Sequence, residues 1–251
     1  MSINLSLTHQ IITGDVLAVL PMIPDGAVAL TFADPPYNIG IDYGGGKQAD
    51  RRSDFDYLTW CAKWIAECVR ALRPGGTMWV LINDEYADSF GVMLRRAGLT
   101  RRNWIVWYET FGVNCKSKFN RTKRHLFYCV KGKAHTFNRE AVTRPSARQA
   151  KYNDPRANPN GKCWDDVWQI PRLAGTHKER LPDFPTQLPM SLLNPIVTAT
   201  SNPGDLVLDP FNGSGTTGAV ALTHGRRYIG IELNETYAEA ARERMGAICP
   251  Q

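Results

Sequence analysis

The chain has 251 residues, of which 43% are hydrophobic and 22% charged, as expected for a globular protein with one large domain. No apolar run approaches the roughly 20 residues that cross a bilayer, and the N-terminus lacks the features of a signal peptide, so we expect a cytoplasmic protein without a membrane partner. The six cysteines include no C-x-x-C pair, which favours reduced thiols over a metal site or a disulfide framework.

The net charge of +6 is unevenly distributed along the chain. Residues 101–180 contain eighteen Lys and Arg against six Asp and Glu, a net charge of +12, so the remainder carries −6. Such a concentration is typical of phosphate contacts, although a solvated surface loop could share it. The basic residues that we expect to contact nucleic acid are Lys116, Lys118, Arg121, Lys123, Arg124, Arg139, Arg144, Arg148, Lys151 and Arg156.

Apolar patterning predicts alternating strands and helices, and therefore an α/β fold with a mostly parallel sheet. Asp15 and Asp54 are candidate helix caps, and the Pro74-Gly75-Gly76 turn is expected to end the second helix. The predicted strands cover 10–13, 27–33, 77–82, 104–108, 125–130, 206–208 and 228–231. The predicted helices end near residues 20, 72, 96, 199, 223 and 245, the last of them beginning at Asn234.

Two segments lack this regular pattern. The glycine-rich stretch around Gly44-Gly45-Gly46 could be a lid over a site or only a flexible connector. Residues 131–185 are rich in Pro, Arg, Lys and Asn and read as a loop-rich insertion. Its aromatic residues could stack on bases or form a small satellite core, and we expect the latter of Trp164 and Trp168.

A short motif ends the buried strand at 27–33. The sequence there reads LTFADPPYN, and two prolines stop the strand directly after Asp34. A carboxylate, a rigid carbonyl and a phenol ring are thereby presented at the carboxyl end of a strand, where open α/β sheets bind ligands. Asp34, Pro35, Pro36 and Tyr37 are the candidate catalytic residues.

A glycine loop, Phe211 to Gly215, lies between a strand ending at Asp209 and a helix. Gly213–Gly218 matches G-x-G-x-x-G, and Glu232 follows nineteen residues after Gly213, as in nicotinamide dinucleotide enzymes. A carboxylate at Asp209, however, suits a cationic ligand better than a pyrophosphate. The second feature against a nicotinamide enzyme is the Asp-Pro-Pro-Tyr turn, which a hydride-transfer site does not require. S-adenosylmethionine satisfies both features, because it has a ribose, an adenine and a cationic amino-acid end but no phosphates.

Together these motifs resemble the DNA amino-methyltransferases, which methylate the exocyclic amino group of adenine or cytosine. The resemblance rests on ADPPY at 33–37, Pro185-Thr186-Gln187 and DPFNGSGTT at 209–217, and their order is like the permuted β-class arrangement. Phe184 departs from the histidine often found before this P-T-Q stretch. The resemblance implies a Rossmann-like methyltransferase fold. Residues 1–130 would form the catalytic part of the domain, residues 131–185 an inserted target-recognition region and residues 186–251 the cofactor-binding part.

The resemblance also implies which side chains hold S-adenosylmethionine, with Asp15 bonding its adenine. The expected cofactor residues are Asp15, Ala33, Asp34, Thr186, Gln187, Asp209, Phe211, Asn212, Gly213, Ser214, Gly215, Thr216, Glu232, Leu233 and Asn234. Asp34 and the Pro35 carbonyl would accept hydrogen bonds from the target amino group, and Tyr37 would stack on the flipped base.

The function expected from these residues is site-specific N6-adenine methylation of double-stranded DNA. N4-cytosine methylation shares the chemistry, and Asp rather than Ser at position 34 favours adenine. RNA or protein amide methylation, a nicotinamide-dependent oxidoreductase and an inactive nucleic-acid-binding protein are further alternatives. Family resemblance also implies a homodimer of bacterial or phage origin that acts alone or with a restriction endonuclease.

Overall fold

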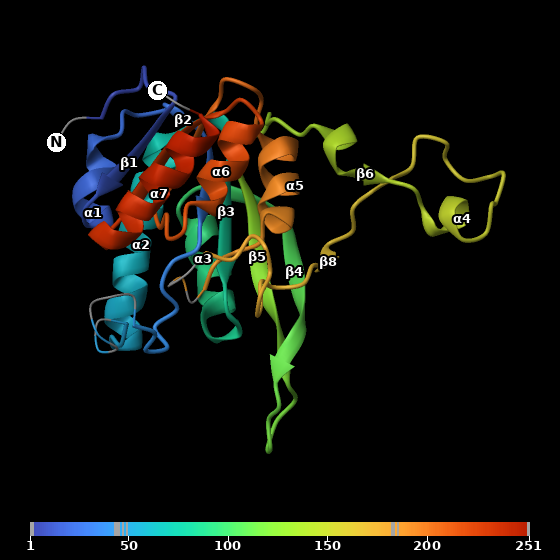
Figure 1. Cartoon of the computed structure of the whole chain (residues 1–251), viewed down its shortest axis with the longest axis horizontal. Coiled ribbons are helices and arrows are strands. Elements are labelled where there is room, and N and C mark those ends of the chain that lie inside the picture. Colours follow the sequence, from blue (N-terminus) through green and yellow to red (C-terminus); the bar gives the residue numbers. More distant parts are fainter. Residues whose placement is uncertain are drawn as a thin grey trace.

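The computed structural model describes residues 3–42, 46, 48, 50–181, 184 and 186–249. Its centre is an eight-stranded sheet in the order β1-β10-β9-β2-β3-β5-β4-β8, with helices on both faces (Figure 1). The strands are β1 (His9–Thr13), β2 (Val28–Ala33), β3 (Leu72–Ile82), β4 (Leu99–Val113), β5 (Arg121–Lys131), β8 (Val167–Gln169), β9 (Leu206–Asp209) and β10 (Arg227–Glu232). The helices are α1 (Val16–Val19), α2 (Asp54–Ala71), α3 (Ala87–Arg96), α4 (Ala147–Ala150), α5 (Met190–Thr200), α6 (Thr216–Thr223) and α7 (Glu235–Ile248).

The order in which the chain adds strands to the sheet reverses between β9 and β2. Strands β1, β10, β9, β2 and β3 pair in parallel, whereas β5 runs antiparallel to both β3 and β4. The chain passes from β9 through α6 to β10 on one side and from β2 through α2 to β3 on the other. Ligands bind at such a switch point, outside the carboxyl ends of the strands. The expected α/β fold with a mostly parallel sheet is confirmed.

Alternating side chains of the central strands supply a core on each face of the sheet. On β3, Met78 and Val80 point toward the layer of α1, α2 and α3, whereas Trp79 and Leu81 point toward α5, α6 and α7. Both clusters consist of almost fully buried residues, so each helix layer is held by its apolar face. The result is a three-layer arrangement whose middle layer carries the strand ends at 33–37 and 209–215.

Two predicted boundaries in this region are wrong. Ser53 rather than Asp54 caps α2, because its hydroxyl accepts from the backbone N–H of Asp56 at 3.1 Å. Strand β3 begins at Leu72 and includes the Pro74-Gly75-Gly76 segment, which was expected to be a turn. A register shift against β2 accommodates the extra residues, and Gly75 takes a φ of +79° there. Such a bulge breaks the apolar alternation by which a strand is recognised in sequence.

Two segments project from the body in Figure 1. Strands β4 and β5 extend well beyond their predicted ends to form a long hairpin, so Arg121 to Arg124 lie on β5 rather than in a connecting loop. The second projection, here called the arm (residues 139–166), contains a small two-stranded sheet of β6 (Thr143–Arg144) and β7 (Lys162–Cys163) together with α4. The insertion is therefore more regular than predicted.

The tryptophans of the insertion pack on the main sheet instead of forming a satellite core. Trp168, on β8, is buried against Trp79 at a ring-centroid distance of 6.0 Å. Trp164 meets Trp168 edge-on at 5.5 Å. Gly44 and Gly45, on which the expectation of a lid rested, lie outside the described residues. None of the helices in the described ranges combines the length and apolarity needed to cross a membrane.

Candidate active site

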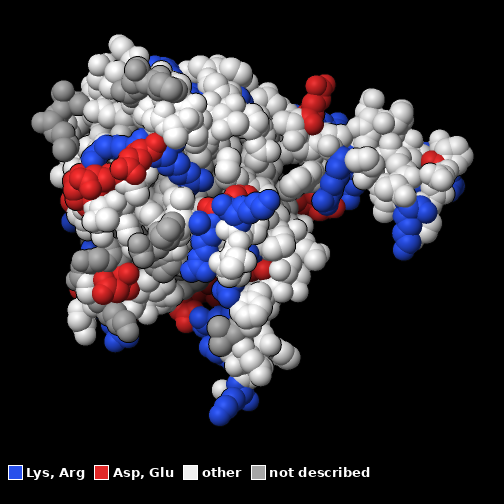
Figure 2. Space-filling model, in the orientation of Figure 1, with Lys and Arg blue, Asp and Glu red and all other residues white. Residues whose placement is uncertain are grey.

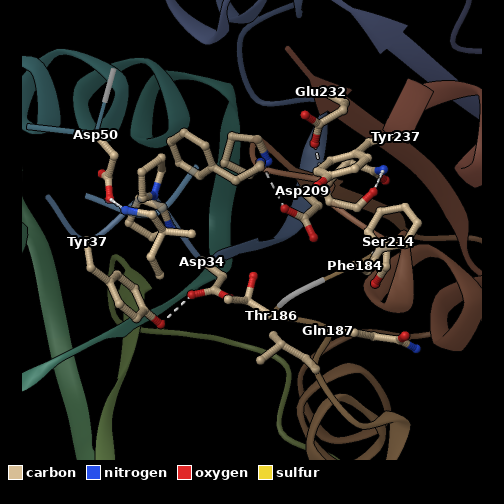
Figure 3. Close-up of a pocket in the computed structure, with 18 of the residues that line it drawn as sticks. Asp34, Tyr37, Asp50, Phe184, Thr186, Gln187, Asp209, Ser214, Glu232 and Tyr237 are labelled. Atoms are coloured by element: carbon tan, nitrogen blue, oxygen red, sulfur yellow. Dashed lines mark hydrogen bonds between the residues drawn. The ribbon is translucent and has the colours of Figure 1, made fainter. Parts of the chain in front are cut away.

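A cavity of about 860 Å³ opens at the carboxyl ends of β1, β10, β9 and β2. Each strand end contributes to its wall: Asp15 after β1, Glu232 of β10, Asp209 of β9 and Asp34 after β2. Figure 3 shows the carboxylates of Asp34, Asp209 and Glu232 arranged around the cavity. The two sequence motifs, far apart along the chain, are thus brought together because β2 and β9 are neighbours in the sheet.

The turn after β2 is held in shape from two sides. The hydroxyl of Tyr37 donates to Asp34 Oδ1 at 2.5 Å, which ties the two ends of the turn together (Figure 3). The hydroxyl of Tyr57, on α2, donates to the carbonyl of Pro36 at 2.7 Å. Proline fixes φ and restricts the residue before it, so Asp34 and Pro35 have little freedom to reorient.

The chain that leaves the turn is anchored by a single carboxylate. Asp50 is buried and accepts hydrogen bonds from the backbone N–H groups of residues 38–41, at 2.9 to 3.2 Å. Asn38 takes a left-handed conformation, with a φ of 60°, and its side chain bonds Arg52 and Tyr86. The segment after the Asp34–Tyr37 turn is therefore fixed against the residues that precede α2 and against the first 3-10 turn after β3.

The glycine loop is shaped by Glu232. The Gly213 N–H donates to Glu232 Oε2 at 2.8 Å, and the Asn234 N–H donates to Oε1 at 3.0 Å. Gly215 precedes α6 with a φ of +71°, and a Cβ there would come within 3.0 Å of Met245. A side chain at this position would therefore be strained and crowded, which explains why the helix begins at glycine.

The carboxylates of the cavity are electrostatically unusual. Burial raises the pKa of Asp34 to about 6 and that of Asp209 to about 7. Burial also raises the pKa of Glu232 above its ordinary value, while its backbone N–H partners oppose the shift. A bound cation with hydroxyl groups would stabilise the ionised forms, so the wall suits a cationic nucleoside better than a dinucleotide phosphate.

Comparison with known proteins identifies the family. A family model described as DNA methylase, for N6 and N4 methyltransferases, matches residues 28–243. The chain belongs to this DNA methylase family. It is 39% identical to the DNA adenine methyltransferase YhdJ of Escherichia coli K12, over 94% of this chain and 82% of that protein. It is 37% identical to the type II methyltransferase M.BamHI of Bacillus amyloliquefaciens, over 94% of this chain and 56% of that protein.

Solved structures share the fold of this methylase. A DNA modification methylase of Thermus thermophilus (TTHA0409), in complex with S-adenosyl-L-methionine, superposes with a TM-score of 0.69 at 24% identity, over 96% of each chain. The cytosine-N4-specific PvuII DNA methyltransferase gives a TM-score of 0.70 at 20% identity, over 94% of this chain and 86% of that chain. These superpositions confirm the predicted Rossmann-like methyltransferase fold, and the family model confirms the predicted resemblance to DNA amino-methyltransferases.

Most of the predicted site residues of the methylase line one cavity. Two expected cofactor residues do not: Ala33 is fully buried in the core, and Gly215 lies beneath the loop against Met245. Asp15 caps α1 by accepting from the Leu17 N–H and also lines the wall. The lining residues predicted from sequence are Asp15, Asp34, Pro35, Pro36, Tyr37, Thr186, Gln187, Asp209, Phe211, Asn212, Gly213, Ser214, Thr216, Glu232, Leu233 and Asn234.

The side chains of Gln187 and Asn212 also form hydrogen bonds to other residues of the protein. The amide of Gln187 accepts from Leu181 N–H at 2.7 Å and donates to the Glu179 carbonyl at 2.6 Å, which ties down the preceding segment. The Asn212 side chain accepts from the hydroxyl of Tyr228 at 2.8 Å, under the glycine loop. These two residues therefore position the wall of the cavity.

Several cavity residues escaped the sequence analysis. The rings of Phe184 and Tyr237 pack together with centroids 4.5 Å apart and planes tilted by 35°, and the rings of Trp60 and Phe211 lie 5.7 Å apart. Glu109, on β4, also lines the cavity. The one signal in the sequence was Phe184, which replaces the histidine often found before the P-T-Q stretch. An aromatic ring at that position suggests an aromatic partner, and the structure shows that this partner is Tyr237. Nothing in the local sequence of the others points to a ligand.

The predicted DNA-contacting residues of the methylase occupy different surroundings. Lys116 and Lys118 are exposed near the hairpin tip, and Arg121 and Lys123 lie at the mouth of the cavity. In Figure 2, Lys and Arg gather over the middle of this face, along the hairpin and on the arm. The predicted DNA-contacting residues of the arm, all of them exposed, are Arg139, Arg144, Arg148, Lys151 and Arg156. Arg124, in contrast, points into the cavity, where it pairs with Glu109.

Proposed function

We propose that this DNA methylase transfers the methyl group of S-adenosyl-L-methionine to the N6 amino group of an adenine extruded from double-stranded DNA. The observation that carries the proposal is the adjacency of two motifs. The Asp34-Pro35-Pro36-Tyr37 turn ends β2, the glycine loop follows β9, and both line one cavity at the switch point of the sheet.

The residues around the glycine loop fit S-adenosyl-L-methionine. Glu232 offers acceptors suited to ribose hydroxyls, and the packed rings of Phe184 and Tyr237 present an apolar surface to the same cavity. Asp209 supplies negative charge for the cationic amino-acid end. When bound, the cofactor would supply an activated methyl group on a sulfonium.

The catalytic turn would prepare the amino group for methylation. An aromatic amino group is a weak nucleophile because its lone pair is delocalised into the ring. Asp34 and the Pro35 carbonyl are both acceptors, and hydrogen bonds from the amino hydrogens to them would localise that pair. The Tyr37 ring offers a stacking face for the extruded base. The chain has no Pro-Cys pair, so the covalent route of carbon-5 cytosine methylation is not supported.

Adenine is favoured over cytosine by Asp34 and by the similarity to an E. coli protein named as a DNA adenine methyltransferase. Incubation of unmodified bacterial DNA with the protein and cofactor, followed by digestion to nucleosides and mass spectrometry, tests this. We expect N6-methyladenine. Detection of N4-methylcytosine alone would assign the enzyme to the alternative base, and no methylated nucleoside would overturn the proposal.

We further propose residues 131–185 as the target-recognition region, between a catalytic part at 1–130 and a cofactor-binding part at 186–251. The exposed basic residues of the arm support this division. We also propose a cytoplasmic homodimer, which light scattering after size-exclusion chromatography tests. Two relatives named as type II methyltransferases, M.HpaI and M.BamHI, support a restriction endonuclease as the cognate partner.

Neutralising the hairpin tip should weaken DNA binding in a salt-dependent manner. If Lys116 and Lys118 each contact a phosphate, Lys116→Gln/Lys118→Gln should lower the slope of log Kd against log salt by about two. Fluorescence anisotropy with labelled duplex measures the slope. Lys63→Gln, at an exposed position on α2, is the control and should leave it unchanged. A double variant with the wild-type slope would remove the hairpin tip from the interface.

Cofactor binding should depend on pH through Asp209. Burial raises the pKa of this carboxyl to about 7, and a cationic ligand favours the ionised form, so binding releases a proton. Affinity should therefore rise by about tenfold from pH 6 to pH 8 and level off above. Calorimetry across this range measures it. In Asp209→Asn the affinity should be lower and should lose this dependence; a wild-type pH dependence in the variant would contradict the assignment.

A further inference from the structure

Arg124 differs from its basic neighbours on β5. Its side chain is 21% exposed, against 44% for Arg121 and 46% for Lys123. Side chains alternate along a strand, so Arg124 points away from the face that carries Arg121 and Lys123. The guanidinium lies 2.7 Å from Glu109 Oε1 through Nε and donates from Nη1 to the Tyr37 hydroxyl at 3.2 Å. A phosphate contact was expected of it, yet its partners lie inside the cavity.

The guanidinium also lies close to two aromatic rings. Its central carbon is 5.4 Å from the ring centroid of Tyr37 and 5.5 Å from that of Trp107. Trp107, directly opposite Arg124 on β4, is almost fully buried, and its indole N–H donates to the Ile170 carbonyl. The cation therefore lies within cation–π distance both of a buried, hydrogen-bonded indole ring and of the Tyr37 ring.

Glu109 reaches this position through an irregularity in β4. The pairing of β4 with β5 shifts register between Tyr108 and Val113, and Thr110 takes a φ of 61°. Bulges of this kind redirect side chains next to active sites. Glu109 is 7% exposed and its carboxylate forms an ion pair with Arg124, so the bulge places a buried negative charge beside the guanidinium.

We propose that Arg124, held by Glu109 and Trp107, is a positioning residue that fixes the ring of Tyr37 and keeps the Asp34 carboxylate ionised for methyl transfer. The inference deepens the proposed function and rests on it. The Tyr37 hydroxyl bridges the two groups, since it accepts from Arg124 and donates to Asp34. The hairpin that carries the basic tip is thereby linked directly to the catalytic turn.

The charged and titratable groups around Asp34 oppose one another. Burial raises its pKa, and the nearby Glu109 carboxylate also raises it, whereas the Arg124 charge and the Tyr37 hydrogen bond lower it. Asp209, across the cavity, interacts with Asp34 in the unfavourable sense of two like charges. Loss of the Arg124 charge would therefore favour the protonated carboxyl, which offers a donor where the amino group needs an acceptor.

The test compares Arg124→Gln, Arg124→Lys and wild type by methyl-transfer kinetics between pH 5.5 and 9. In the wild type, kcat should fall as the pH drops through about 6. Arg124→Gln should lower kcat about 10- to 100-fold at pH 7 and move the acid limb to higher pH, so the deficit shrinks toward pH 9. Arg124→Lys keeps the charge and should retain an acid limb near that of the wild type.

Further measurements separate this role from folding and from DNA contact. The dissociation constant for S-adenosyl-L-methionine should be unchanged in both variants, which reports a folded cavity. Arg73→Gln, which removes an Arg–Asp205 ion pair at the amino ends of the strands, is the matched control and should leave the pH profile unmoved.

Two results would overturn the inference. One is a kcat deficit in Arg124→Gln that is the same at every pH. The other is a decrease of about one in the salt slope of DNA binding, which would mark a phosphate contact. A wild-type protein that methylates no base would instead defeat the proposed function, so the two failures are distinguishable.

Discussion

Replacement of Asp34 by Asn should reduce kcat for methyl transfer by about 1,000-fold, with little change in the affinity for S-adenosyl-L-methionine. An asparagine keeps the size of the side chain, but it loses the negative charge and can present a donor to the target amino group. Removal of one preorganised polar group at a reacting centre typically costs on the order of 100- to 1,000-fold. Single-turnover transfer of tritiated methyl groups to a duplex measures the effect.

Two controls accompany Asp34→Asn: a second Asp→Asn variant at an exposed position, and the cofactor affinity of Asp34→Asn itself. Asp88→Asn, at an exposed position on α3, should retain wild-type turnover. Cofactor affinity of Asp34→Asn, measured by calorimetry, reports whether the cavity is intact, because the residues around the glycine loop are unchanged. Turnover of Asp34→Asn within tenfold of wild type would contradict the assignment of Asp34 as the acceptor for the amino group.

Replacement of Glu232 by Ala should weaken the binding of S-adenosyl-L-methionine by about 100-fold. The variant loses the acceptors for the Gly213 and Asn234 N–H groups, which fix the shape of the loop, and it loses the acceptors proposed for the ribose. Hydrogen bonds to a charged group contribute about 1.5–3 kcal/mol each, and about 2.8 kcal/mol corresponds to 100-fold.

Calorimetry with the free cofactor measures this effect, and DNA binding in its absence should be unaffected. Glu232→Gln, which keeps one carbonyl acceptor, should lie between wild type and Glu232→Ala. Glu239→Ala, at an exposed position on α7, is the control. An unchanged dissociation constant in Glu232→Ala would show that this carboxylate neither shapes the loop nor holds the cofactor.

Local sequence signals were sufficient for the two motifs and for most of the sheet. The prolines after Asp34 stop β2 because they cannot continue its hydrogen-bond ladder, and the glycines from 213 to 215 permit a left-handed turn before α6. Continuous apolar runs marked buried parallel strands, since both faces of such strands are covered by helices. These effects act over a few residues, so they can be recognised without knowledge of the fold.

The parts that were missed depend on pairing between distant residues. The bulges in β3 and β4 arise from register against neighbouring strands, so nothing local predicts that β3 begins at Leu72 or that Glu109 faces Arg124. Tyr237 reaches Phe184 only because α7 lies beside the cofactor side of the cavity. In the same way, the three basic residues of one short segment, Arg121, Lys123 and Arg124, look equivalent in sequence.

Local sequence patterns were enough to indicate the family, the Asp34-Pro35-Pro36-Tyr37 turn after β2 and the glycine loop after β9. That these two motifs share one cavity follows from the fold, because their adjacency requires β2 and β9 to pair across the switch point of the sheet. Packing of the hairpin also brings Arg124 to Glu109 and Tyr37, whereas Arg121 and Lys123 pair with Glu85 and Asp84. Strand alternation separates these neighbours, because successive side chains on β5 point to opposite faces, and the packed sheet places Glu109, Trp107 and Tyr37 on the side of Arg124.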